Sequence, residues 1–177
     1  MELVGVAFNL VYTWMYLRGQ VPAAYLFAAV GGVSLAMACW RKNLQAETAL
    51  HAFYVGMAGY GAWIASGEVW VLEWGSVAHH ILAVSIGALL SLGLRVLLKA
   101  RGSSMPLLDA ITTVFSVIAT WWMIQGDPFN WLYWMAIDAL SVYLYAKRGM
   151  PWGALLFAIY CLMAIDGWFE EISWFSG

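Results

Sequence analysis

Residues 130–145 read NWLYWMAIDALSVYLY and form the most informative stretch of the chain. At about 100° per residue, five of its polar or aromatic positions fall within roughly 80° of one another on a helix. These five positions are Trp131, Trp134, Asp138, Ser141 and Tyr145. A carboxylate within an apolar helix is costly unless it faces a partner, a cavity or a substrate. The stripe, with Asn130 at its start, therefore predicts one wall of a small-molecule site on a membrane-spanning helix.

The composition of the whole chain is that of a membrane protein. Of its 177 residues, 64% are hydrophobic and only 10% are charged, and the mean hydropathy of +0.77 lies far outside the range of soluble domains. Seven segments approach or exceed the length needed to cross a bilayer. They are residues 3–17, 20–40, 47–66, 75–98, 105–124, 128–146 and 150–169. The sequence predicts an all-α integral membrane protein with seven transmembrane helices and the lipid bilayer as its surroundings.

Charges are unevenly distributed between the predicted loops. The net charge of −2 says nothing about nucleic acid, but no basic patch exists, so we expect no nucleic-acid partner. With seven spans, one side of the membrane holds most of the basic residues: Arg41, Lys42, Lys99, Arg101, Lys147 and Arg148. The other side holds Arg18 beside five acidic residues: Glu68, Glu73, Asp127, Glu170 and Glu171. The positive-inside rule then places the N-terminus in the cytoplasm and the C-terminus outside.

The two ends of the chain align with each other at an offset of 106 residues. Matching positions include Pro22 with Pro128, Tyr25 with Trp131, Gly61 with Gly167, and Arg41-Lys42 with Lys147-Arg148. The alignment predicts a first three-helix repeat in residues 1–67, a linker helix in 68–103 and a second repeat in 104–177. This is a parallel 3+1+3 plan, a transporter architecture in which substrate is expected between the repeats.

Three further spans carry candidate site residues, and each has a simpler explanation. In the fifth span, Asp109, Thr112, Thr113, Ser116 and Thr120 share one face that could bind substrate hydroxyls, although such hydroxyls often bond to helix backbone. In the third span, Tyr60 and Trp63 could form an opposing aromatic wall or could pack between helices, and His51 is a further candidate for substrate contact. In the seventh span, Asp166 could face the substrate or extend its side chain to the membrane interface.

No motif for catalysis or metal binding occurs in the sequence. There is no paired nucleophile and base, no metal-ligand spacing and no nucleotide-binding fingerprint. We therefore expect no catalytic residue, no metal, no cofactor and no enzymatic activity. Cys39 and Cys161 lie in separate spans and are expected to be packing residues. The adjacent His79 and His80 would point about 100° apart on a helix, which favours an interfacial position.

The run Asn130-Trp131-Leu132-Tyr133-Trp134, followed by Asp138, Ser141, Tyr145 and Lys147-Arg148-Gly149, resembles the sixth-helix signature of the PnuC vitamin transporters. That family is similar to the SWEET sugar transporters in its 3+1+3 plan. The resemblance implies facilitated diffusion of nicotinamide riboside or a related vitamin across a bacterial inner membrane, with trapping of the substrate by cytoplasmic phosphorylation. It also implies a homotrimer, and contact of Trp131, Trp134 and Asp138 with the substrate.

Three alternatives remain open from the sequence. Pyridinium and thiazolium rings are both flat cations that suit aromatic faces beside an anion, so thiamine is a second candidate substrate. Proton-coupled transport is possible through a relay of acidic and histidine side chains, namely Asp109, Asp138, Asp166 and His51. A non-transporting membrane scaffold is the third alternative, and the internal repeat and the polar stripes weigh against it.

Overall fold

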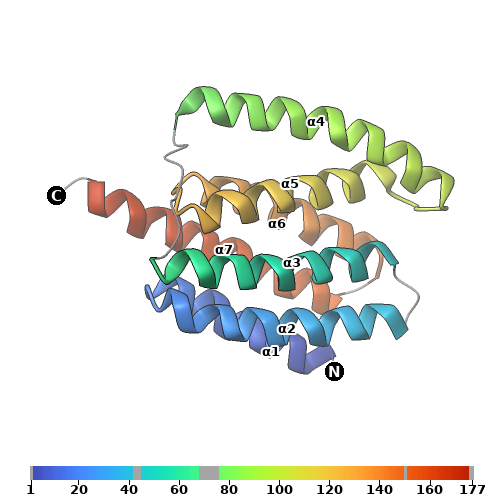
Figure 1. Ribbon diagram of the computed structural model, residues 1–177. Coiled ribbons are helices and arrows are strands. Elements are labelled where there is room, and N and C mark those ends of the chain that lie inside the picture. Colours follow the sequence, from blue (N-terminus) through green and yellow to red (C-terminus); the bar gives the residue numbers. More distant parts are fainter. Residues whose placement is uncertain (1, 42–44, 68–75, 150, 176–177) are drawn as a thin grey trace. The chain divides into compact units, whose positions relative to one another are not determined.

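The computed structural model describes residues 2–41, 45–67, 76–149 and 151–175 (Figure 1). Within this part of the chain there are seven α-helices and no strand. They are α1 (Glu2–Leu17), α2 (Val21–Arg41), α3 (Gln45–Ala65), α4 (Val77–Ala100), α5 (Pro106–Ile124), α6 (Asn130–Lys147) and α7 (Pro151–Phe175). The expected number and order of helices are confirmed.

Four of these helices contain segments long and apolar enough to cross a membrane by length and composition alone. The segments are Val21–Ala38, Val77–Ala100, Pro106–Ile124 and Gly153–Glu170. Residues Leu3–Leu17 of α1 are apolar but shorter. Helices α3 and α6 are not among these. In α6 the polar and charged residues Asn130, Asp138 and Lys147 lower the hydropathy, so the helix with the candidate site is poorly suited to lipid on all sides.

Proline and glycine residues fix the ends of the helices around α6. Pro106 and Pro151 occupy the first positions of α5 and α7, where a missing N–H costs nothing. Gly126 (φ 71°) follows α5 and Gly149 (φ 66°) follows α6, and both adopt the left-handed conformation that ends a helix. The seventh helix extends to Phe175, beyond the predicted end at residue 169, because the acidic pair Glu170-Glu171 does not interrupt the helix.

The chain divides into two compact units, Met1–Val71 and Leu72–Gly177. In the first unit, α2 packs against both α1 and α3 (Figure 1). Small residues allow the close approach that membrane helices need. A Cβ atom at Gly32 would lie 2.8 Å from a methyl group of Val55, and one at Gly61 would overlap the ring of Tyr25.

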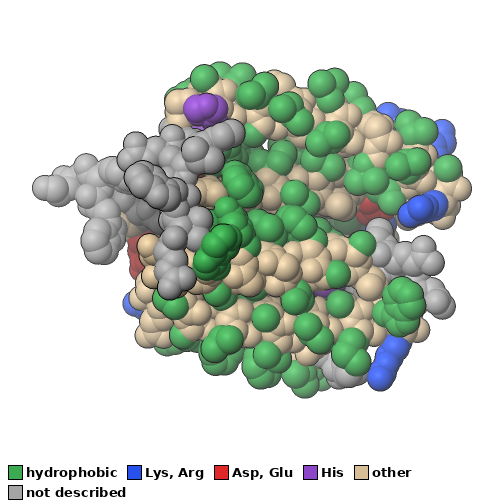
Figure 2. All heavy atoms as spheres, in the orientation of Figure 1, with side chains coloured by type: hydrophobic (Ala, Val, Ile, Leu, Met, Phe, Trp, Pro, Cys, Tyr) green, Lys and Arg blue, Asp and Glu red, His purple; other side chains and the backbone are tan. Residues whose placement is uncertain are grey.

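In the second unit, each helix packs against the next one in the chain, α4 on α5, α5 on α6 and α6 on α7. Helix α4 presents much apolar surface, with Leu89 and Val96 70% and 67% exposed. Figure 2 shows hydrophobic side chains along this helix, and Lys and Arg side chains at its C-terminal end. Such a surface is suited to contact with acyl chains, as in a membrane-spanning helix.

The predicted segments 1–67, 68–103 and 104–177 and the 3+1+3 plan remain predictions. In the structure, α4 belongs to the same compact unit as α5, α6 and α7. Lys42, Glu68 and Glu73, which contributed to the charge argument, lie outside the described residues.

Candidate functional site

The polar and aromatic stripe of α6 faces the interior of the second unit. Trp131, Asp138 and Ser141 are buried, and Asn130 is 1% exposed. Trp134 and Tyr145 are half-buried. The opposite face is exposed, with Leu132 at 39% and Tyr143 at 51%. The helical spacing therefore predicted correctly which residues of α6 share the inner face.

Both ends of the stripe are fixed by glycines of α7. A Cβ atom at Gly167 would lie 2.6 Å from Cε2 of Trp131, and one at Gly153 would overlap the ring of Tyr145. The Tyr145 ring also lies 4.9 Å, centroid to centroid, from that of Phe157. Trp131 and Tyr145 are thus packing residues of the α6–α7 pair, whatever else they contact.

The middle of the stripe has unused hydrogen-bonding capacity. Asp138 is 3% exposed, and its carboxylate makes no hydrogen bond or ion pair within the described residues. One turn before it, the buried Nε1 of Trp134 also has no acceptor in that part of the chain. A buried carboxylate without a partner is costly, so this position is suited to a group supplied from outside the described residues.

The hydroxyl groups of α5 divide into two kinds. Thr112 Oγ1 donates to the carbonyl oxygen of Leu108 (2.9 Å), and Thr120 Oγ1 donates to that of Ser116 (2.7 Å). These two hydroxyls bond to the backbone of their own helix, so they are not needed to explain substrate binding. Thr113 is half-buried and Ser116 is buried, and neither hydroxyl bonds to another described residue, so these two remain candidates for substrate contact.

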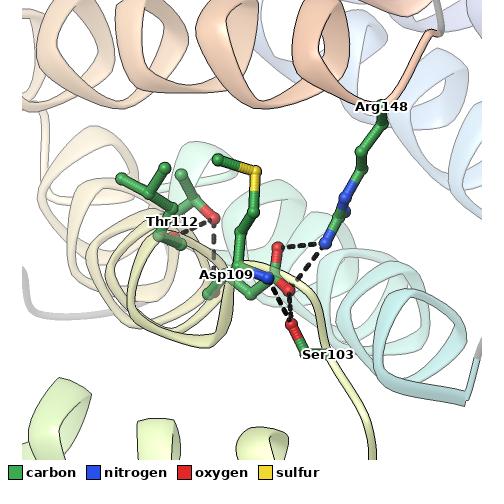
Figure 3. A network of polar contacts seen from close by, with 6 residues as sticks. Ser103, Asp109, Thr112 and Arg148 are labelled. Atoms are coloured by element: carbon green, nitrogen blue, oxygen red, sulfur yellow. Dashed lines mark hydrogen bonds and ion pairs between the residues drawn. The ribbon is translucent and has the colours of Figure 1, made fainter.

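Asp109 is held by two residues that the sequence did not connect with it (Figure 3). Arg148, which directly follows α6, donates from Nη2 to both carboxylate oxygens at 2.8 and 2.7 Å. The Ser103 hydroxyl donates to Oδ2 at 2.5 Å. The charge of the Asp109 carboxylate is paired with that of Arg148 near the N-terminal end of α5. Neither substrate binding nor a proton relay can use Asp109 without breaking this pair.

The remaining candidate residues lie on α3 of the first unit and on α7. Tyr60 and Trp63 meet edge to face at 6.2 Å between ring centroids, and Trp63 is 53% exposed. The half-buried His51 meets Tyr54 in the same way at 6.0 Å. Asp166 is exposed. Their participation in a site remains a prediction.

Sequence reasoning missed a buried cluster around His80, at the N-terminal end of α4. Its Nε2 lies 3.2 Å from Asp127 Oδ2, and its Nδ1 lies 3.2 Å from Tyr133 Oη. The rings of Trp122 and Phe129 lie 4.5 and 4.9 Å from the imidazole, centroid to centroid. Sequence patterns could not show this burial, because the aromatic and acidic partners are 42 to 53 residues away, and the interfacial position expected for His80 stays a prediction.

His79 and Cys161 each contact a neighbouring group. His79 Nδ1 lies 2.7 Å from Ser76 Oγ, so the adjacent histidines do point to different partners. Cys161 Sγ lies 3.7 Å from the Met135 carbonyl oxygen, a contact between α7 and α6, whereas the side chain of Cys39 lies outside the described part. Among the described residues, no group of three or more His, Cys, Asp or Glu side chains could hold a metal ion.

Comparisons with known proteins agree on one family. The family described as nicotinamide mononucleotide transporter matches residues 1–175. The nicotinamide riboside transporter PnuC of Haemophilus influenzae is 26% identical over 165 residues, which cover 86% of this chain and 70% of that protein. A crystal structure of the vitamin B3 transporter PnuC matches with a TM-score of 0.78 at 19% identity, covering 97% of this chain and 80% of the other.

Proposed function

The chain belongs to the nicotinamide mononucleotide transporter family, and from this premise we propose that it carries nicotinamide riboside across a bacterial cytoplasmic membrane by facilitated diffusion. Family membership makes it a multi-pass membrane transporter and not an enzyme, as the sequence predicted. The curated relative is named as a nicotinamide riboside transporter, and this supports the choice of substrate.

The observation that carries the proposal is the unpartnered carboxylate of Asp138 beside the indole of Trp134. Nicotinamide riboside has a flat pyridinium ring with a positive charge. An aromatic face attracts such a ring, and a desolvated anion nearby offsets its charge. The Ser141 hydroxyl, one turn beyond Asp138, is buried on the same face and could bind a substrate hydroxyl. Thr113 and Ser116 of α5 are the further candidates for the ribose.

The riboside is favoured over the phosphorylated mononucleotide by the charges of α6. Residues 130–145 contain Asp138 and no basic residue. The basic residue closest to this stripe on α6 is Lys147, nine residues from Asp138, or about 14 Å along a helix. Arg148, the next basic residue, is engaged with Asp109. A phosphate group would thus meet an anion without a compensating cation on this helix.

Transport without energy coupling is consistent with the pairing of Asp109. The proposed proton relay needs several free carboxylates, and one of its four members is bound to Arg148. Phosphorylation of the substrate in the cytoplasm would then drive net uptake. The expected homotrimer is part of the same proposal, and light scattering of the purified protein in detergent tests it.

The experiment is a titration of the purified full chain with nicotinamide riboside, nicotinamide mononucleotide and thiamine, followed by tryptophan fluorescence and by calorimetry. Trp134→Ala and Asp138→Leu should abolish binding of the riboside. Asp138→Asn keeps the shape and removes the charge, and should weaken binding about tenfold, or 1.4 kcal/mol. Glu170→Gln, a charge-matched change at an exposed residue of α7, is the control.

Each outcome has a defined meaning. Binding of thiamine alone would select the second candidate substrate. Equal binding by Asp138→Asn and the wild type would show that hydrogen bonding rather than charge is recognised. Unchanged riboside binding by both Trp134→Ala and Asp138→Leu would contradict a site on α6.

A further inference from the structure

We propose that His80 of α4 is a positioning residue, which acts through Asp127 to fix the start of α6. The expected effect of His80 on ligand affinity rests on the proposed function, because Trp134 and Asp138 of α6 are the proposed ligand contacts. The cluster around His80 lies outside the stripe of α6 and has no role in the transport mechanism described so far.

Asp127 organises the turn from which α6 begins. Its Oδ1 accepts a hydrogen bond from the backbone N–H of Phe129 at 2.9 Å. Its carbonyl oxygen accepts the backbone N–H of Asn130 at 3.0 Å and the Asn130 side-chain amide at 2.6 Å. Asp127 is 8% exposed and Asn130 1% exposed, so water cannot readily replace these bonds. The first residues of α6 therefore depend on the position of Asp127.

The imidazole of His80 binds the remaining oxygen of the same carboxylate. Oδ2 of Asp127 lies 3.2 Å from Nε2. An ionised carboxylate only accepts, so Nε2 carries the proton and Nδ1 of a neutral ring accepts from the Tyr133 hydroxyl. Tyr133 lies on α6 itself, one turn after Phe129. His80 is thus joined to α6 twice, through the turn before it and through its first turn.

The surroundings of His80 hold the ring in this orientation. Trp122 of α5 and Phe129 of the turn lie against the imidazole. Phe129 in turn contacts Trp168 of α7 at 5.9 Å between centroids. His80 thus connects the N-terminal end of α4 to the α5–α6 turn, and Phe129 connects that turn to α7. Displacement of Asp127 would move the first turn of α6, which Trp134 directly follows.

The test compares His80→Phe with His80→Gln in the purified full chain. Phenylalanine keeps a ring against Trp122 and Phe129 but loses both nitrogens. Glutamine keeps a donor for Asp127 and an acceptor for Tyr133. The matched control is His79→Gln, at the adjacent histidine, which instead hydrogen-bonds Ser76.

Two measurements are made on each variant. Hydrogen exchange of the ligand-free protein, followed by mass spectrometry, should be at least about tenfold faster over residues 127–134 in His80→Phe. The affinity for nicotinamide riboside should fall about tenfold in the same variant. His80→Gln should restore both values to near those of the wild type, and His79→Gln should change neither.

Unchanged exchange in His80→Phe would overturn the proposal. Equal effects of the Phe and Gln variants would also overturn it, because keeping the donor for Asp127 and the acceptor for Tyr133 would then make no difference. Faster exchange without loss of affinity would overturn the positioning role for the site. If the wild type bound none of the three ligands, the proposed function would fail instead, and the exchange comparison would still decide whether His80 fixes the start of α6.

Discussion

Gly167 of α7 holds the indole of Trp131 so closely that a methyl group at position 167 would lie 2.6 Å from Cε2 of the ring. Gly61 of α3 has the same relation to the ring of Tyr25 of α2. Gly167 lies 106 residues after Gly61, and Trp131 lies 106 residues after Tyr25. This is the offset at which the sequence aligns with itself. Each unit therefore joins two of its helices through an aromatic ring packed on a glycine, at positions that the sequence alignment pairs, while the repeat itself stays a prediction.

Gly167→Ala should destabilise the protein and displace Trp131. The atoms in the way belong to the fused part of the indole, which cannot move aside as the end of a flexible chain can. Overpacking of this kind typically costs about 1–3 kcal/mol. The thermal unfolding temperature in detergent should fall, and Gly61→Ala should have a similar effect through Tyr25.

Gly93→Ala is the matched control for this prediction. Gly93 lies within α4, and a Cβ atom there would meet nothing within 4 Å. Because alanine is the better helix former, the control should be neutral or stabilising by up to about 1 kcal/mol. Equal unfolding temperatures for Gly167→Ala and the wild type would show that the indole adapts at no cost.

The helices could be predicted because the bilayer imposes a simple rule on sequence. Every span needs a long apolar run, and all seven runs in the sequence became helices in the structure. The inner face of α6 was predictable for a related reason, since the helical period places Trp131, Asp138 and Ser141 together. Both signals are local in the chain.

The contacts that local patterns do not encode were missed. Arg148 appeared only as a loop charge, but it binds Asp109, 39 residues earlier. For His80, the sequence did not indicate burial against Asp127 and Tyr133. In both cases the partner comes from another helix or turn, so the pairing depends on tertiary packing. A charged or histidine residue at the end of a span can face water or a neighbouring helix, and its own segment does not distinguish the two.

The pairing of Asp109 with Arg148 should be measurable as a coupling energy. The side chains are 16% and 27% exposed, and both carboxylate oxygens lie within 2.8 Å of Nη2. Arg148→Met should cost about 1–3 kcal/mol of stability, because it leaves a largely buried carboxylate with only the Ser103 hydroxyl. Once Asp109→Leu has removed the carboxylate, adding Arg148→Met should cost much less. Lys147→Met, at an exposed neighbour, should have little effect in either background. Additive losses in a double-mutant cycle of unfolding measurements would show that the pair is not coupled.

Uptake of nicotinamide riboside should not depend on a proton gradient. Facilitated diffusion follows the substrate gradient alone, and a relay through Asp109 would first have to break its ion pair. The measurement is uptake of radiolabelled substrate by proteoliposomes with an imposed proton gradient, with and without a protonophore. Equal initial rates are expected, with protein-free liposomes as the control. Loss of uptake when the gradient is dissipated would establish proton coupling instead.

The orientation of the chain can be tested at two exposed loop positions. The positive-inside rule places Ser104, between α4 and α5, in the cytoplasm and Gln20, between α1 and α2, outside. In a background with Cys39 and Cys161 replaced by alanine, Gln20→Cys should react with a membrane-impermeant maleimide in intact cells, whereas Ser104→Cys should react only after lysis. The reverse pattern would place the N-terminus outside. In that case the basic cluster of Lys99, Arg101 and Lys147 would face the exterior, and the loop charges would not have determined insertion.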